Sequence, residues 1–161
     1  MGGAAERVGE RVFLVVLDES PELRNALRYA CRRAKRTGGR VAMLYVMEPP
    51  ESQHWGAVVE LMREEARQQA EEVVARHADA VATMTGQPPT IYIREGMNRD
   101  ELLKLLAEDP SISVLVLGGA TGGEGPGPLV TALLGKFAGQ LRTPLTIVPG
   151  SLTDAQIDAI T

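Results

Sequence analysis

The sequence has 161 residues, a length typical of one domain with one hydrophobic core. Aromatic residues make up only 4% of it, so the core must be aliphatic, as in a parallel sheet covered by helices on both faces. The formal net charge of −4 leaves no large phosphate-neutralising surface, which argues against a nucleic-acid partner. The lone cysteine, Cys31, excludes a disulfide framework and a cysteine metal cluster.

The sequence contains no run of about 18 apolar residues, the length of a membrane-spanning helix, and no recognisable signal peptide. We therefore expect a cytoplasmic protein with no membrane partner. Residues 1–10 are small and polar, which predicts a flexible N-terminus. Residues 11–150 predict one α/β domain, and residues 151–161 predict a C-terminal tail.

Five short aliphatic segments alternate with longer amphipathic segments. The aliphatic segments predict strands at residues 11–17, 40–47, 90–94, 113–117 and 144–148. The amphipathic segments predict helices at residues 21–37, 54–84, 98–108 and within 127–141. The resulting βαβαβαβαβ order, with right-handed crossovers, predicts a single open, doubly wound, five-stranded parallel sheet with helices on both faces.

Capping signals predict where two of the helices begin. Ser20 followed by Pro21 is a favoured pair for the N-cap and the first position of the first helix. Thr153 and Gln156 have the spacing of a capping box, which predicts a turn of helix in the C-terminal tail.

Ligands of doubly wound sheets bind beyond the carboxyl ends of the strands, so the segments that follow the strands are the candidate sites. The segment after the fourth strand, GGATGGEGPGP, is the richest in glycine, which lets a ligand approach the backbone closely. Two interpretations stay open: a phosphate-binding loop, or a loop whose glycines only satisfy turn geometry. The Walker A motif and the G-x-G-x-x-G fingerprint are both absent, which disfavours P-loop NTPases and dehydrogenases.

Several segments resemble the universal stress protein family. VVLDESPELRNAL resembles that family's first strand ending in V-D-x-S, and VAMLYVMEP resembles its second strand. REGMNRDELL resembles its E-G segment, and VLVLGGATGG resembles its fourth strand followed by G-x-x-G. The resemblance covers nearly the whole domain. It implies a universal-stress-type α/β domain that binds ATP, with Mg²⁺, at the loop after the fourth strand, forms a homodimer, and acts as a stress-response sensor or adaptor.

The resemblance also implies a set of nucleotide-binding residues. Asp18 would contact the adenosine part, Val41 would form a wall of the adenine site, and Leu117 would lie under the base. Backbone N–H groups of the loop glycines would bind the phosphates, and Gly135 with Lys136 would occupy the last pair of the family motif. The full set is Asp18, Val41, Leu117, Gly118, Gly119, Gly122, Gly135 and Lys136.

The sequence departs from the family motif in two ways. Twelve residues separate Gly122 from Gly135, three more than in the family motif, and Lys136 replaces a small hydroxyl residue. An alternative is therefore a homodimeric interaction module of the same fold that binds no nucleotide. A third hypothesis is a weak nucleotide hydrolase. We expect no catalytic residues and no metal site, because His54 and His77 are far apart and belong to no recognisable catalytic motif.

Overall fold

The computed structural model describes residues 9–50 and 56–161. Strands and helices alternate as the sequence predicts. In chain order the main elements are β1 (Val12–Val16), α1 (Leu23–Thr37), β2 (Arg40–Met47), α2 (Gly56–Thr85), β3 (Thr90–Glu95), α3 (Asn98–Glu108), β4 (Val114–Gly119), α4 (Pro128–Leu134), β5 (Leu145–Pro149) and α5 (Asp154–Ile160). Residues 1–8 of the predicted flexible N-terminus, and His54 at the predicted start of the long helix, lie outside the described residues.

The five strands form one parallel sheet in the order β3-β2-β1-β4-β5. Phe13 in β1 is opposite Val41 of β2 on one side and Val114 of β4 on the other. The chain therefore winds outward from β1 in both directions, and the order reverses between β1 and β4. This arrangement confirms the doubly wound α/β fold and leaves a crevice where the loops after these two strands diverge.

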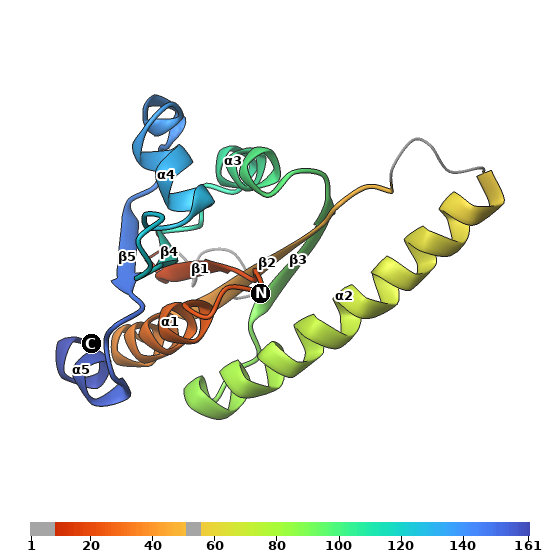
Figure 1. The fold of residues 1–161 in the computed structure, drawn as a ribbon. Coiled ribbons are helices and arrows are strands. Elements are labelled where there is room, and N and C mark those ends of the chain that lie inside the picture. Colours follow the sequence, from red (N-terminus) through yellow and green to blue (C-terminus); the bar gives the residue numbers. More distant parts are fainter. Residues whose placement is uncertain (1–8, 51–55) are drawn as a thin grey trace.

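Helices cover both faces of the sheet (Figure 1). On one face, β1 side chains such as Phe13 and Val15 pack with residues of α1, α2 and α5. On the other face, Leu14 and Val16 pack with Leu102 of α3 and other residues of α3 and α4. Alternate residues of β1 are thus buried on opposite faces, which explains why this strand is a continuous aliphatic run in the sequence.

The start of α1 differs from the sequence-based expectation. The helix begins at Leu23, its N-cap is Glu22, and no side chain caps it. The hydroxyl of Ser20 instead donates to Asp18 Oδ1 at 2.6 Å. The prediction that Ser20 caps a helix starting at Pro21 is therefore wrong, because Ser20 instead forms a turn with Asp18, to which both its backbone N–H and its hydroxyl donate.

The fourth helix is short. It runs from Pro128 to Leu134 and ends at Gly135, whose φ of −106° and ψ of −111° are not helical. A short 3₁₀ turn, Ala138–Gln140, follows it. This agrees with the prediction of a helix within residues 127–141, and it places Lys136 beyond the C-terminus of the helix.

The C-terminal segment forms a helix, as its capping-box spacing predicts. Thr153 Oγ1 accepts from the backbone N–H of Gln156 at 3.2 Å, and the Gln156 side chain accepts from the Thr153 N–H at 2.9 Å. The helix buries Ile157 against the sheet side that α1 covers. Arg28 of α1 holds Asp158 with two hydrogen bonds of 2.8 and 2.7 Å, so α5 is fixed to the body by both apolar and ionic contacts.

Candidate functional site

A cavity of about 1280 Å³ opens at the carboxyl ends of β1 and β4, where the strand order reverses. Two loops form most of its wall, residues 18–22 between β1 and α1 and residues 120–127 between β4 and α4. The start of α3 supplies a third side through Met97, Asn98 and Arg99. Open α/β sheets bind their ligands at this position, so the cavity is the candidate site.

Part of the cavity wall is aliphatic. Val116 and Leu117 contribute to it from β4, Leu23 from α1, and Leu129 and Val130 from α4. These side chains line the cavity although Leu117, for example, is only 5% exposed. An aliphatic wall with a few polar groups around it is typical of sites that bind small organic molecules.

Asp18 follows β1 closely and lines the cavity at the switch point. Its Oδ1 accepts from the backbone N–H of Ser20 at 3.0 Å and from the Ser20 hydroxyl at 2.6 Å. These bonds form a tight turn that fixes the carboxylate at the cavity wall. Within residues 9–50 and 56–161, Oδ2 of Asp18 accepts no hydrogen bond, so this oxygen is available to a ligand hydroxyl.

Gly118 and Gly119 are glycines for packing reasons. A Cβ on Gly118 would lie 2.5 Å from the Cβ of Glu22, and one on Gly119 would lie 3.1 Å from Cγ2 of Ile147. Gly118 lines the cavity, whereas Gly119 is buried behind it. A residue with a side chain at position 118 would therefore push the start of α1 away from β4.

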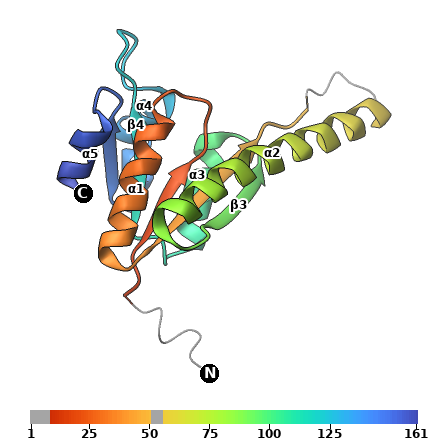
Figure 2. The same cartoon turned by 90° about the horizontal axis from the view of Figure 1, so that it is seen from below.

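The rest of the loop is organised by its own backbone. The N–H of Ala120 donates to the carbonyl of Pro126 at 3.0 Å, which closes the loop at its base. Gly125 and Gly127 have φ values of 95° and 113°, a region that residues other than glycine rarely adopt. Gly122 lines the cavity, and no atom lies within 4 Å of the position that a Cβ would take there. The loop projects beyond the end of β4, next to α4 (Figure 2).

The structure brings together some of the residues that the family resemblance implied, and separates others. Asp18, Leu117, Gly118 and Gly122 line the cavity, and Gly119 lies directly behind it. The other three do not line it. Val41 is a core residue, 2% exposed, near the amino end of β2. Gly135 and Lys136 both follow the C-terminus of α4.

Arg99 lines the cavity and was not among the predicted site residues. Its guanidinium carbon lies 4.2 Å from the centre of the Phe137 ring, a cation–π contact between the start of α3 and the turn after α4. The sequence contained one usable signal, since Arg99 follows the third predicted strand closely. Its partner Phe137 is far away in the sequence, and nothing local indicates that the two meet.

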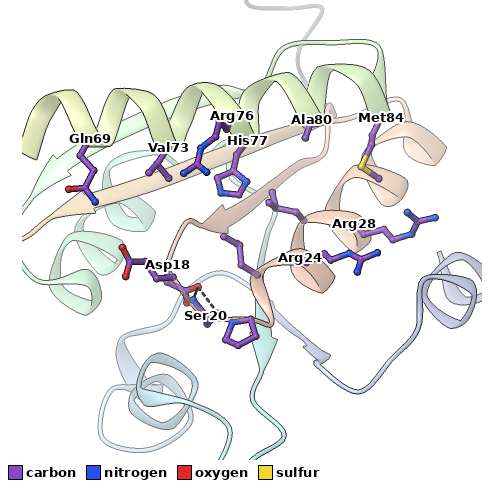
Figure 3. Close-up of a pocket in the computed structure, with 14 residues that line it drawn as sticks. Asp18, Ser20, Arg24, Arg28, Gln69, Val73, Arg76, His77, Ala80 and Met84 are labelled. Atoms are coloured by element: carbon purple, nitrogen blue, oxygen red, sulfur yellow. Dashed lines mark hydrogen bonds between the residues drawn. The ribbon is translucent and has the colours of Figure 1, made fainter.

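A second cavity of about 550 Å³ lies between α1 and α2, on the other side of the Asp18 turn (Figure 3). Arg24 and Arg28 lie on the α1 side of it, and Arg76 and His77 lie on the α2 side. His77 is half-buried, and burial together with the charge of Arg76 lowers its pKa. Figure 3 shows no catalytic arrangement around this imidazole among the residues it labels.

Other reactive groups give no further site. Cys31 is buried within α1, where burial raises the pKa of its thiol to about 11 and leaves it protonated and unreactive. Among the residues that the structure describes, no group of three or more His, Cys, Asp or Glu side chains is arranged to hold a metal ion. No helix in this described part is both long and apolar enough to cross a membrane.

The family model of the universal stress protein family matches residues 10–149. The chain belongs to the universal stress protein family. Its sequence match spans every strand of the sheet and the glycine-rich loop. A comparison with curated protein sequences finds no significant match.

Solved universal stress proteins share the fold. UspA from Lactobacillus plantarum has a TM-score of 0.70 at 18% identity, over 86% of this chain and 97% of that chain. A universal stress protein in complex with cAMP has a TM-score of 0.61 at 19% identity, over 88% and 98%. A universal stress protein from Archaeoglobus fulgidus in complex with dAMP has a TM-score of 0.55 at 14% identity, over 86% and 97%.

Proposed function

We propose that this universal stress protein binds an adenine nucleotide in the cavity between β1 and β4 and acts as a cytoplasmic stress-response sensor or adaptor. The observation that carries the proposal is the meeting of Asp18 with the glycine-rich loop around one cavity at the switch point. The fold alone would not specify a ligand. The two structures in complex with cAMP and dAMP support the choice of an adenine nucleotide.

The cavity offers a separate group for each part of such a ligand. The aliphatic wall around Leu117 and Val130 suits the adenine ring. The Oδ2 atom of Asp18 suits a ribose hydroxyl, because a carboxylate accepts hydrogen bonds strongly. Gly122 and Gly123 have no side chains and line the cavity, so their backbone can approach a phosphate closely.

ATP with Mg²⁺ stays a prediction within this proposal. Asp18 and Glu124 both line the cavity, and carboxylate oxygens are the ligands that Mg²⁺ prefers. The position of Gly135 and Lys136 outside the cavity wall argues against binding of a triphosphate. The proposal therefore rests on the adenosine part of the ligand.

Calorimetric titration with adenosine, AMP and ATP tests the proposal directly. We expect binding by the native chain and a loss of about tenfold or more for Asp18→Ala, as for a hydrogen bond to a charged group. Glu19→Ala is the matched control, because Glu19 is the next residue but does not line this cavity. If none of the three compounds binds at millimolar concentration, the chain is not an adenine-nucleotide protein.

A nucleotide-free interaction module is the second candidate. One observation favours it: the last pair of the family motif, Gly135 and Lys136, does not reach the cavity. We propose a homodimer in either case, formed along β5, which pairs only with β4 within the described sheet and leaves Leu145 and Ile147 half-buried. A dimer mass in light scattering, together with no nucleotide binding in the titration, would favour the interaction module. A monomer mass would contradict the proposed homodimer.

A further inference from the structure

The charges around the cavity are strongly unbalanced. Four carboxylates line it: Asp18, Glu22, Glu48 and Glu124. Among the described residues that line it, Arg99 is the only arginine or lysine. A ligand with several phosphates would bring three or more negative charges to a wall that already carries four, with one cation to offset them. The charge of this wall therefore limits how much phosphate the site accepts.

Arg99 is held in place before any ligand arrives. Its guanidinium stacks on Phe137 at 4.2 Å, and its Nε donates to Asp100 Oδ1 at 3.1 Å. Its two terminal nitrogens make no hydrogen bond to any other described residue. Those nitrogens carry the paired N–H groups that match two phosphate oxygens, so the side chain is oriented and still has donors to offer.

Phe137 is itself fixed by the fold. Its backbone N–H donates to the carbonyl of Ala132 at 3.0 Å, and Ala132 lines the cavity. The ring therefore sits at the end of the same wall that α4 contributes. Lys136 has its Nζ 5.7 Å from the ring centre, but Lys136 does not line the cavity. Of the two cations beside this ring, only Arg99 is positioned to contact a ligand.

We propose that the cavity selects an adenine nucleoside that carries a single phosphate group, and that Arg99 is the residue that binds this phosphate. The inference rests on the proposed function, because it concerns the same site. One guanidinium offsets the charge of one phosphate through a two-point contact. Each additional phosphate that comes within about 4 Å of a carboxylate costs roughly fivefold in affinity even in a water-like dielectric.

Titration calorimetry with adenosine, AMP and ATP at constant ionic strength, with and without Mg²⁺, measures this selection. We expect AMP to bind about 10- to 100-fold more tightly than adenosine, because a charged hydrogen-bonded contact is gained. We expect ATP to bind at least about fivefold more weakly than AMP. ATP binding as tight as AMP, with or without Mg²⁺, would overturn the inference, and so would equal affinities for AMP and adenosine.

Variants at Arg99 identify the residue responsible. Arg99→Ala and Arg99→Gln should both reduce the affinity for AMP to that for adenosine, while the affinity for adenosine stays unchanged. Arg99→Lys should keep part of the gain, because it retains the charge and loses the two-point geometry. The matched control is Lys104→Ala, a cation on the same helix that does not line the cavity. Unchanged AMP affinity in Arg99→Ala and Arg99→Gln would overturn the role of Arg99.

The carboxylate in the loop gives a second, independent readout. Glu124→Gln removes one negative charge from the cavity wall without changing the size of the side chain. In buffer without Mg²⁺, we expect this substitution to narrow the difference in affinity between AMP and ATP. Failure of the inference and failure of the proposed function are distinguishable. If adenosine binds and ATP is preferred to AMP, only the single-phosphate inference falls; if no adenine compound binds, both fall.

Discussion

The backbone of Gly118 and the side chain of Glu22 occupy adjoining space, with only 2.5 Å between the Cβ of Glu22 and the position a Cβ on Gly118 would take. The Cγ of Glu22 also lies 2.8 Å from the position that a Cβ on Gly150 would take. The N-cap residue of α1 therefore fits between the ends of β4 and β5. This contact fixes the width of the cavity, because α1 carries one wall and the loop after β4 carries the other.

Gly118→Ala should destabilise the protein by about 1–3 kcal/mol, the usual cost of inserting a methyl group into a well-packed region. The new methyl would meet the backbone of Glu22 as well as its side chain, and backbone moves least easily. Urea unfolding monitored by circular dichroism measures the change. Gly122→Ala is the control, since a Cβ there meets no atom within 4 Å and should change stability by less than about 0.5 kcal/mol. Equal stability of the two variants would contradict the packing argument.

Much of the fold could be predicted from the sequence because its signals are local. The strands are continuous aliphatic runs, and Thr153 with Gln156 gives the α5 capping box within four residues. The cap pattern misplaces the start of α1 because Ser20 forms a turn with Asp18 instead, and nothing in the pattern distinguishes the two arrangements. The loop glycines differ in role: Gly118 packs closely against Glu22, whereas Gly122 forms an open part of the cavity wall.

The rest of the candidate site depends on contacts between distant segments. Arg99 gains its place from Phe137, on a turn that follows another helix, and neither residue has a local pattern that marks it. The family resemblance implied that Lys136 belongs to the site, yet α4 ends before it and it follows the turn at Gly135. Such relationships come from tertiary packing, so the residue types and their spacing do not contain them.

The hydrogen bond from the Tyr92 hydroxyl to Asp109 Oδ2, 2.5 Å long, should be visible in a pH titration. Burial, helped by this hydrogen bond and the charge of Asp109, raises the pKa of Tyr92 to about 12. The neutral phenol thus favours the folded state below pH 10, and this contribution is lost as the pH rises from about 10 towards 12. Ultraviolet absorbance should show one tyrosine that ionises later than the others.

Tyr92→Phe should remove that late transition and lower the free energy of unfolding by about 0.5–1 kcal/mol near neutral pH. Tyr29→Phe is a matched control, because Tyr29 makes no hydrogen bond through its hydroxyl among the described residues. If the late transition persists in Tyr92→Phe, a different tyrosine carries the raised pKa.

Acid should loosen α5 from α1. The Arg28 guanidinium, hydrogen-bonded to Asp158, lowers the pKa of that carboxyl below its usual range. A lowered pKa means that the contact contributes stability above the unfolded-state pKa, near 4, and that this contribution is lost as the pH falls through the folded-state value. Melting temperatures measured from pH 7 down to pH 3 should therefore fall more steeply for the native chain than for Asp158→Asn. Asp79→Asn, on exposed α2, should follow the native curve.

The short helix α4 buries two side chains, Val130 and Leu133. Leu133 is fully buried against the sheet face that α3 also covers, whereas its neighbour Leu134 is 59% exposed. Leu133→Ala should cost about 2–5 kcal/mol of stability through lost burial and the cavity it leaves. Leu134→Ala, the same substitution one residue away, should change stability by less than about 0.5 kcal/mol.

Because α4 supplies Leu129 and Val130 to the cavity wall, the same pair of variants links stability to binding. Leu133→Ala, assayed at a temperature where it remains folded, should bind adenosine more weakly than the native chain does. Leu134→Ala should bind it normally. A Leu133→Ala protein that is folded, destabilised and still binds adenosine with native affinity would mean that α4 does not form the wall of the adenosine site.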